Sequence, residues 1–415
     1  MWRAVLGSST RRHSILTIKT PSEKHARALM DIEKSEGILV DFWKPPRRTE
    51  GSADIRVAPE QIMRMKTFLK KHGLSYDVMI EDLGKQVRGE RENLQKRKVF
   101  NAGDDPSELS LDEFHNLTEI YAYLHSVSSR YPSTVELFSI GKSFQQRDQL
   151  GLKIGNAGEG KRKVVLHGCI QSREWLSCAT MWYIINELTA NAHNYQDLLS
   201  KLDIFILPVV NPDGYEVTWS EDRFWRKTLS GPRNGCLGAD SNRNFDIEFM
   251  VSGASNDPCS DFYAGPYAFS EPEVLNIANF LARHNDSIDA YFDVHCYSEL
   301  FMFPFGHAKV YPSDVDNLRR VAEDAVQVMN AQHGESFKAG SIVEIIYEVS
   351  GGSIDYAKAA LGIQYTYAVE LRPVLEGFPL PTGFVISNEQ IIPGASEGWA
   401  GFQSAFREVI KGHGL

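Results

Sequence analysis

The chain has 415 residues, of which 42% are hydrophobic, 24% are charged and 11% are aromatic, and its formal net charge is −10. This composition excludes a disordered, collagen-like or coiled-coil protein, and the length predicts two or three domains of about 150 residues each. No apolar run approaches the roughly 18 residues that span a bilayer, and the acidic balance argues against nucleic-acid binding, so we expect neither a membrane nor a nucleic acid as a partner.

Charge is unevenly distributed along the chain. Residues 1–98 contain 21 Lys and Arg against 13 Asp and Glu, a balance of +8, whereas the remainder contains 23 against 41, a balance of −18. Such an asymmetry indicates two units that attract each other.

The N-terminal part alternates between β-branched stretches and amphipathic ones, in the order βαββαβ. This order predicts a small open-faced α/β sandwich over residues 14–82, and its lack of clustered catalytic residue types indicates an accessory unit. We predict strands at 14–20, 37–44, 53–58 and 74–82, and helices at 22–35 and 59–71.

Residues 83–109 are predicted to be a linker helix and a cleavable connection. Residues 83–98 are charged all round and have few apolar positions, which favours a solvated helix or linker. Arg88, Arg91 and the run Lys96-Arg97-Lys98 offer cleavage sites to a basic-specific protease, because proteolysis concentrates in exposed polar linkers.

From residue 110 to residue 415, strands alternate with helices. This alternation predicts an α/β domain with one large, mixed and mostly parallel sheet wrapped by helices. We predict strands at 135–141, 149–155, 163–170, 203–210, 289–295 and 363–371, and helices at 111–129, 173–191, 271–284, 312–332 and 395–411.

Two of these strands end near residues that can take part in catalysis. Glu174 follows the strand at 163–170, and His295 ends the strand at 289–295. Ligands of open α/β sheets bind at the carboxyl ends of strands, and a carboxylate with a histidine forms part of a catalytic zinc site. A structural ion pair between the two residues is the alternative.

Glu370, near the end of the last predicted strand, is a candidate general base because burial raises the pKa of a carboxyl group. A structural pair with Arg372 is the alternative. Arg173, Arg226 and Arg243 flank loops. Guanidinium groups suit a carboxylate or an oxyanion, although any one of the three can be a solvated surface residue.

The five cysteines are too few for a disulfide scaffold and have no CxxC spacing, so at most two disulfides form and at least one thiol stays free. Residues 1–14 contain no apolar run of the length found in signal peptides. The cysteines are Cys169, Cys178, Cys236, Cys259 and Cys296.

Eight motifs in order closely resemble the A/B subfamily of zinc metallocarboxypeptidases, the pancreatic procarboxypeptidase type. The similarity runs from about residue 14 to the C-terminus, and residues 1–98 resemble the family's inhibitory activation segment. The motifs are HGCIQSREW, NPDGYE, DRFWRKT, CLGADSNRNFD, FDVHCYSELFMFPFG, IYEVSGGSID, YAVELRP and SNEQIIPGASEGW.

The resemblance implies a role for each matching residue of the catalytic centre. Glu174 and His295 match two ligands of one Zn²⁺ ion, and Glu370 matches the general base. Arg226 matches the group that stabilises the oxyanion. The implied reaction is hydrolysis of the C-terminal peptide bond of peptides and proteins.

Further matches concern the substrate. The resemblance implies that Asn242, Arg243 and Tyr347 bind the terminal carboxylate and that Arg173 and Tyr297 form outer subsites. The remaining matched positions are the pocket floor at Ile354, the pocket lining at Met302, Gly306, Ile342, Ile346, Val349 and Ala368, and the disulfide Cys236–Cys259.

An apolar pocket predicts a preference for large apolar or aromatic C-terminal residues. The implied disulfide indicates secretion, since disulfides persist in oxidising compartments. We expect a monomeric zymogen whose partners are peptide C-termini, its own inhibitory N-terminal unit and an activating basic-specific protease.

One position departs from the family motif H-x-x-E, whose first residue is here Gln171. A neutral amide oxygen is a poorer zinc donor than His, Cys, Asp or Glu, so we expect weak zinc binding. His167, Cys169 and Cys296 are the possible substitute ligands. Two functions remain open: an exopeptidase that tolerates Gln171, and a pseudo-carboxypeptidase that binds C-terminal tails without cutting them.

Overall fold

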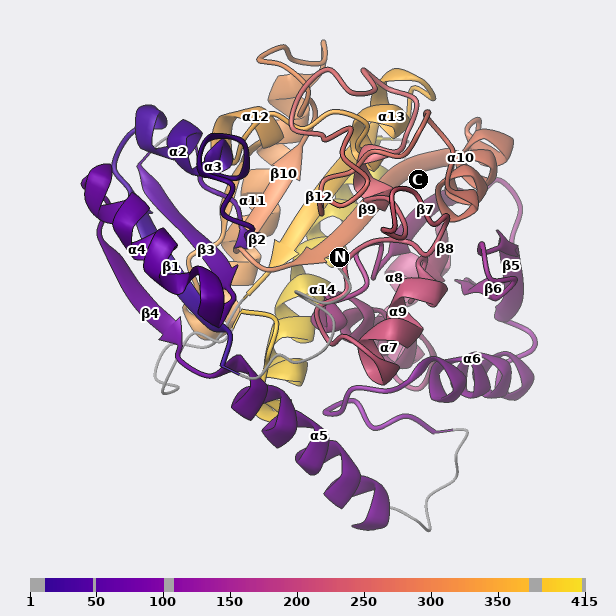
Figure 1. Ribbon diagram of the computed structural model, residues 1–415. Coiled ribbons are helices and arrows are strands. Elements are labelled where there is room, and N and C mark those ends of the chain that lie inside the picture. The colour runs from indigo at the N-terminus through magenta and orange to yellow at the C-terminus, as the bar shows by residue number, and fades with distance from the viewer. Residues whose placement is uncertain (1–11, 48–49, 101–107, 373–382, 413–415) are drawn as a thin grey trace.

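The computed structural model describes residues 12–47, 50–100, 108–372 and 383–412. Within them the chain forms a small sheet near the N-terminus and a large sheet further along, each covered by helices (Figure 1). Residues 1–11, which bear on the expectation about a signal peptide, lie outside the described residues. We call residues 12–82 the N-terminal unit and residues 108–412 the C-terminal unit.

The small sheet is antiparallel throughout, as the βαββαβ order predicts. Side chains of its central strand alternate: Leu16 and Ile18 pack against the helices of the N-terminal unit, whereas Ile15 packs into the core cluster of the C-terminal unit. The strand order is β2 (Asp41–Lys44), β3 (Gly51–Val57), β1 (Ser14–Thr20) and β4 (Tyr76–Ile80), and the helices are α2 (Glu23–Met30), α3 (Ile32–Glu36) and α4 (Ile62–Lys71).

Helix α5 (Leu83–Phe100) corrects the prediction of a solvated linker. Leu83, Val87 and Leu94 are buried in the core cluster of the C-terminal unit, because they recur on one side of the helix. Glu90 on the same helix forms an ion pair with Arg223 at 2.8 Å. The first part of α5 is therefore docked, and the side chains of Arg97 and Lys98 lie outside the described residues.

The large sheet has eight strands and confirms the predicted mixed, mostly parallel architecture. Its four central strands, β12, β9, β7 and β8, are mutually parallel, and the antiparallel pairs lie toward both edges. In spatial order the strands are β11 (Lys338–Ser341), β10 (Leu300–Phe303), β12 (Tyr365–Leu371), β9 (Ile288–Cys296), β7 (Arg162–His167), β8 (Leu202–Leu207), β6 (Asp148–Ile154) and β5 (Val135–Lys142).

Helices cover both faces of the large sheet (Figure 1). Among the described residues, no helix is long and apolar enough to cross a membrane. One face carries α7 (Trp175–Thr189), α11 (Val315–His333) and α14 (Ile391–Gly412), and the other carries α10 (Pro272–His284) and α13 (Ser353–Ala359). The remaining helices are α6 (Leu117–Arg130), α8 (Gln196–Leu199), α9 (Pro212–Ser220) and α12 (Ile342–Ile345).

The parallel strands bring the chemically active positions together at one edge of the sheet. Strand β9 is buried along its whole length, and Glu370 of β12 is directly opposite His295 of β9. On the other side of β9, His167 at the end of β7 is opposite Asp293. The carboxyl ends of these three strands therefore define the candidate site.

Candidate active site

Glu174 and His295 meet at the centre of the site. Glu174 precedes the first turn of α7 and His295 lies near the end of β9, which places His295 Nδ1 2.8 Å from Glu174 Oε2. Both side chains are buried, with 2% and 4% exposure. Burial disfavours the imidazolium, but the carboxylates of Asp293 and Glu174 outweigh it and raise the pKa of His295 well above its ordinary value.

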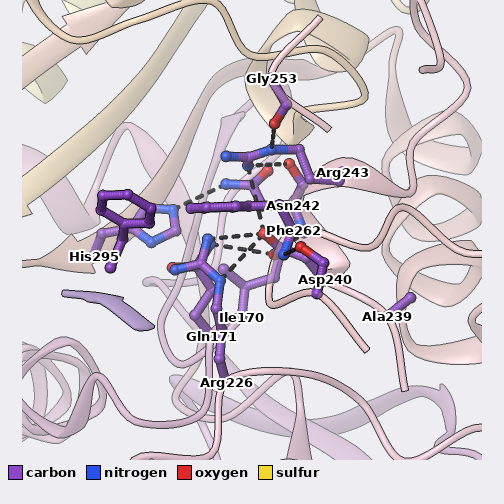
Figure 2. A network of polar contacts seen from close by, with 12 residues as sticks. Ile170, Gln171, Arg226, Ala239, Asp240, Asn242, Arg243, Gly253, Phe262 and His295 are labelled. Carbon is purple, nitrogen blue, oxygen red and sulfur yellow. Dashed lines mark hydrogen bonds and ion pairs between the residues drawn. The ribbon is translucent and has the colours of Figure 1, made fainter. Parts of the chain in front are cut away.

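Gln171 lies beside this pair in the loop between β7 and α7. Its amide Nε2 donates to Asp240 Oδ1 at 3.3 Å (Figure 2). Burial of Asp240 favours its neutral form, but Arg226 and Arg243 outweigh it and lower the pKa of this carboxyl group. Asp240 therefore acts as an acceptor, and the amide oxygen of Gln171 is directed away from it.

The donor set fits a metal ion in part. Glu174 and His295 supply a carboxylate oxygen and an imidazole nitrogen that lie at hydrogen-bond distance from each other, and Gln171 leaves an amide oxygen uncommitted to Asp240. Within the described part of the chain, no three His, Cys, Asp or Glu side chains are grouped as a metal site. The third protein ligand would therefore be the neutral Gln171.

Glu370 is half-buried beside the Glu174–His295 pair, with its Oε2 atom turned into the protein. Its Oε2 atom has no hydrogen-bond partner among the described residues. Burial raises the pKa of Glu370 to about 7, although the neighbouring His295 opposes this shift. Arg372 does not pair with Glu370: its Nε donates to Glu397 Oε2 at 2.6 Å, so the alternative based on that pair is wrong.

Polar side chains form a network on the other side of Gln171 (Figure 2). Arg226 Nη2 donates to Asp240 Oδ2 at 2.8 Å, and Arg243 Nη2 donates to the Tyr347 hydroxyl at 3.2 Å. Asn242 Nδ2 lies 3.1 Å from His295 Nε2. The structure therefore brings the predicted oxyanion group and the predicted carboxylate-binding residues beside the predicted metal ligands.

The predicted pocket is apolar. A cavity of about 90 Å³ extends from Glu174, His295 and Glu370 to apolar side chains. Gly306, predicted as part of the lining, does not line this cavity; an added Cβ there would lie 2.9 Å from the Val349 carbonyl oxygen, so the two backbone segments approach closely. Ile354 is 2% exposed and belongs to the apolar cluster around the cavity rather than to its lining. The apolar lining consists of Met302, Ile342, Ile346, Val349 and Ala368.

The N-terminal unit covers this cavity. Trp43 packs on Phe224 and Phe384, with ring centroids 4.8 and 5.1 Å apart. Arg47 also lines the cavity, and burial lowers the pKa of its guanidinium, although Glu370 opposes this shift. The side chains of Trp43, Lys44, Pro45 and Arg47 thus occupy the entrance.

Both predicted outer-subsite residues contact the N-terminal unit. Arg173 Nη1 donates to Asp41 Oδ1 at 2.7 Å, and its Nη2 donates to the Phe42 carbonyl at 2.9 Å. The Tyr297 hydroxyl donates to Asp54 Oδ2 at 2.8 Å. These contacts hold both side chains against the N-terminal unit.

The predicted disulfide Cys236–Cys259 is present, and a second one joins Cys169 to Cys178. The second disulfide was not predicted; it spans the loop that carries Gln171 and Glu174. It excludes Cys169 as a thiolate ligand in this oxidised structure. Cys296 is the free thiol, and burial with the charges of nearby carboxylates raises its pKa well above the ordinary value.

The ring nitrogens of His167 face Tyr291 and Asp293 and not the predicted metal ligand Glu174. Its Nε2 lies 2.5 Å from the Tyr291 hydroxyl, and burial lowers the pKa of His167 to about 4. Its Nδ1 faces Asp293 Oδ1 at 3.6 Å rather than Glu174. Sequence reasoning missed Asp240 and Asp293, although Asp293 is a polar residue on the same side of a buried strand as His295 and could have been noticed.

Known proteins match this chain over almost its whole length. A family profile described as Zinc carboxypeptidase matches residues 120–401, and one described as Carboxypeptidase activation peptide matches residues 16–90. Carboxypeptidase A2 of Rattus norvegicus is 37% identical, over 95% of this chain and 93% of that protein. Carboxypeptidase A1 of Bos taurus is 34% identical, over 96% of this chain and 94% of that protein.

Two solved structures share the fold over both units. The carboxypeptidase A from Helicoverpa armigera superimposes with a TM-score of 0.89 at 27% identity, and covers 96% of this chain and 97% of its own. Thrombin activatable fibrinolysis inhibitor superimposes with a TM-score of 0.83 at 28% identity, and covers 97% of this chain and 99% of its own. The N-terminal and C-terminal units thus occur together in both.

Proposed function

Because the chain belongs to the zinc carboxypeptidase family and carries that family's activation peptide, we propose that it removes large apolar or aromatic residues from peptide C-termini. The N-terminal unit is its inhibitory activation domain. The observation that carries the proposal is the Glu370 carboxyl group, which lies opposite His295 with its Oε2 atom buried and unpartnered among the described residues.

Glu174, His295 and Gln171 would hold the zinc, which would supply Lewis-acid polarisation of the scissile carbonyl and a more acidic water. Glu370 takes the proton of the attacking water and returns it to the leaving amine. A pKa of about 7 for Glu370 suits both transfers near neutral pH, because burial raises it toward the working pH. Arg226, anchored on Asp240, donates to the oxyanion as it forms.

Specificity for the last residue follows from the neighbouring network. Arg243 and Asn242 donate to the terminal carboxylate, and the Tyr347 hydroxyl adds a third hydrogen bond. The apolar cavity beside them accepts a large apolar side chain. It disfavours Lys and Arg, because a positive charge among the apolar side chains of the cavity would be buried without a partner.

Gln171 weakens zinc binding in this proposal, since an amide oxygen replaces an imidazole nitrogen. Its bond to Asp240 also holds the amide nitrogen, so the oxygen reaches the metal only in the orientation that this bond permits. The same substitution favours the second candidate function, a module that binds C-terminal tails without cutting them.

The setting of the protein is part of the proposal. Two disulfides suit secretion into an oxidising compartment. Residues 14–82 act as the activation domain, 83–109 as the cleavable connection and 110–415 as the peptidase domain. A basic-specific protease activates the chain, which acts as a monomer on peptide and protein C-termini.

Peptides that differ only in their last residue, Phe or Arg, test this function on trypsin-activated protein with saturating zinc. We expect release of Phe and not of Arg, and loss of release in Glu370→Gln, which removes the proton acceptor but keeps the shape. Binding of the Phe-ended peptide without any release would contradict the exopeptidase and establish the binding module.

A further inference from the structure

Asp293 lies directly behind His295 as seen from Glu174. The two residues are two positions apart on β9 and therefore on the same face of the strand. Asp293 is fully buried, and its Oδ1 lies 3.0 Å from His295 Nε2. This oxygen has no hydrogen-bond partner among the described residues.

The other carboxylate oxygen of Asp293 is fixed. Asn242 Nδ2 donates to Oδ2 at 3.0 Å, and the Ser353 hydroxyl donates to the same atom. These two hydrogen bonds orient the carboxylate, so that Oδ1 is left beside the imidazole ring of His295. Oδ1 is therefore held in place rather than free to turn away, and His167 Nδ1 faces it from 3.6 Å.

The imidazole proton of His295 needs an acceptor when a metal is bound. His295 Nδ1 faces Glu174, so a metal that binds there must take the place of any proton on Nδ1. The imidazole then carries its proton on Nε2, inside the protein, where a buried N–H group needs an acceptor. Asp293 Oδ1 is the acceptor at hydrogen-bond distance.

We propose that Asp293 is a positioning residue for the metal site: it holds the metal-binding tautomer of His295 and strengthens its bond to zinc. A carboxylate behind a ligating histidine fixes the tautomer and raises the basicity of the ring. In this chain the added basicity at His295 offsets the poor donor at Gln171. The inference rests on the proposed function, because it requires that zinc binds at Glu174 and His295.

Metal affinity tests the proposal without reference to turnover. Zinc affinity of the full chain is measured by competition with a chromophoric chelator for the unmodified protein, Asp293→Asn and Ser353→Ala. We expect Asp293→Asn to weaken binding by about 10–100-fold, as for other carboxylates behind metal-ligating histidines. Ser353→Ala removes one of the two bonds that orient the carboxylate but keeps its charge beside His295, so we expect a smaller loss of affinity than in Asp293→Asn.

A measurement on the unmodified protein covers the case in which Asp293→Asn does not fold. Zinc loading of ¹⁵N-labelled protein should produce a slowly exchanging, strongly downfield proton on His295 Nε2, the signature of an imidazole bonded to a carboxylate. Absence of that resonance in zinc-loaded protein, or equal zinc affinity of folded Asp293→Asn, would overturn the role of Asp293 and leave the proposed function intact. Failure of the unmodified protein to take up zinc at all would overturn both.

Discussion

Arg173 Nη1 lies 2.7 Å from Asp41 Oδ1 across the boundary between the two units, and both side chains are buried. In this pair and in Arg223–Glu90 the acid comes from the first 98 residues and the arginine from the C-terminal unit. The net charges of +8 and −18 predict the reverse, with the base in the first 98 residues and the acid in the remainder. Local ion pairs thus set how the units dock, and the overall charges act only at longer range.

Loss of the Asp41 carboxylate should loosen the N-terminal unit. Asp41→Asn leaves the buried Arg173 without its counter-charge, which costs up to about 3–5 kcal/mol when one partner of a buried pair is removed. We expect faster dissociation of the N-terminal fragment after cleavage within α5, measured by size-exclusion chromatography. Asp77→Asn on exposed strand β4 is the control, and equal dissociation from both variants would contradict the role of the pair.

Release should also depend on pH. Burial and the neighbouring Asp41 carboxylate raise the pKa of Asp261 to about 6, although Arg173 and Lys227 oppose this. Asp261 therefore keeps its proton to a higher pH in the docked chain than in the separated C-terminal unit. Docking consequently weakens as the pH rises toward about 6. We expect faster release at about pH 7.5 than at about pH 5, and Asp261→Asn should abolish the difference. Release that is equally fast at both pH values in the unmodified protein would refute this assignment.

Proteolytic activation should begin in the exposed part of α5. Arg91 and Lys96 are exposed, whereas Glu90 anchors the helix to Arg223. Limited trypsin digestion should yield fragments of about 98 and 317 residues, because the basic run ends at Lys98 of 415 residues. Glu90→Gln should speed the cut by freeing the helix. Fragments that arise first within residues 14–82 would contradict the two-unit arrangement.

Ile354→Asp should shift the specificity. A carboxylate in this apolar cluster provides a counter-charge for a C-terminal Lys or Arg and disfavours Phe. We expect at least a tenfold change in the ratio of kcat/KM for Arg-ended over Phe-ended peptides, about 1.4 kcal/mol. Ile354→Val is the control, and an unchanged ratio in folded Ile354→Asp would remove Ile354 from the specificity pocket.

Regular patterns made most of the fold predictable. The fully buried strand β9 and the period-two strand β1 are readable because a sheet imposes those patterns. The short strands β10 and β11 at one side of the large sheet, with four residues each, carry too little pattern to be predicted. The docked face of α5 was missed because three apolar residues spread over residues 83–98 look like a solvated helix.

The candidate site was predictable where a motif names the residue. Glu174, His295 and Glu370 stand near strand ends, and the structure brings all three together. Asp240 was missed because its importance lies in a contact between distant segments, with Gln171, which only the folded chain creates. Asp293 was overlooked although its position two residues before His295 on a buried strand could be read from the sequence. The disulfide Cys169–Cys178 was missed because its short loop carries no pairing signal among five cysteines.

Zinc titration of the activated protein, with release of a C-terminal Phe as the readout, tests most directly whether this is a zinc exopeptidase limited by Gln171. We expect activity that rises with added zinc and disappears on dialysis, whereas Gln171→His should hold zinc at least about 10–100-fold more tightly and be active at low zinc. An unmodified protein that keeps its zinc through dialysis, or a zinc-loaded Gln171→His protein that releases no Phe, would contradict the account.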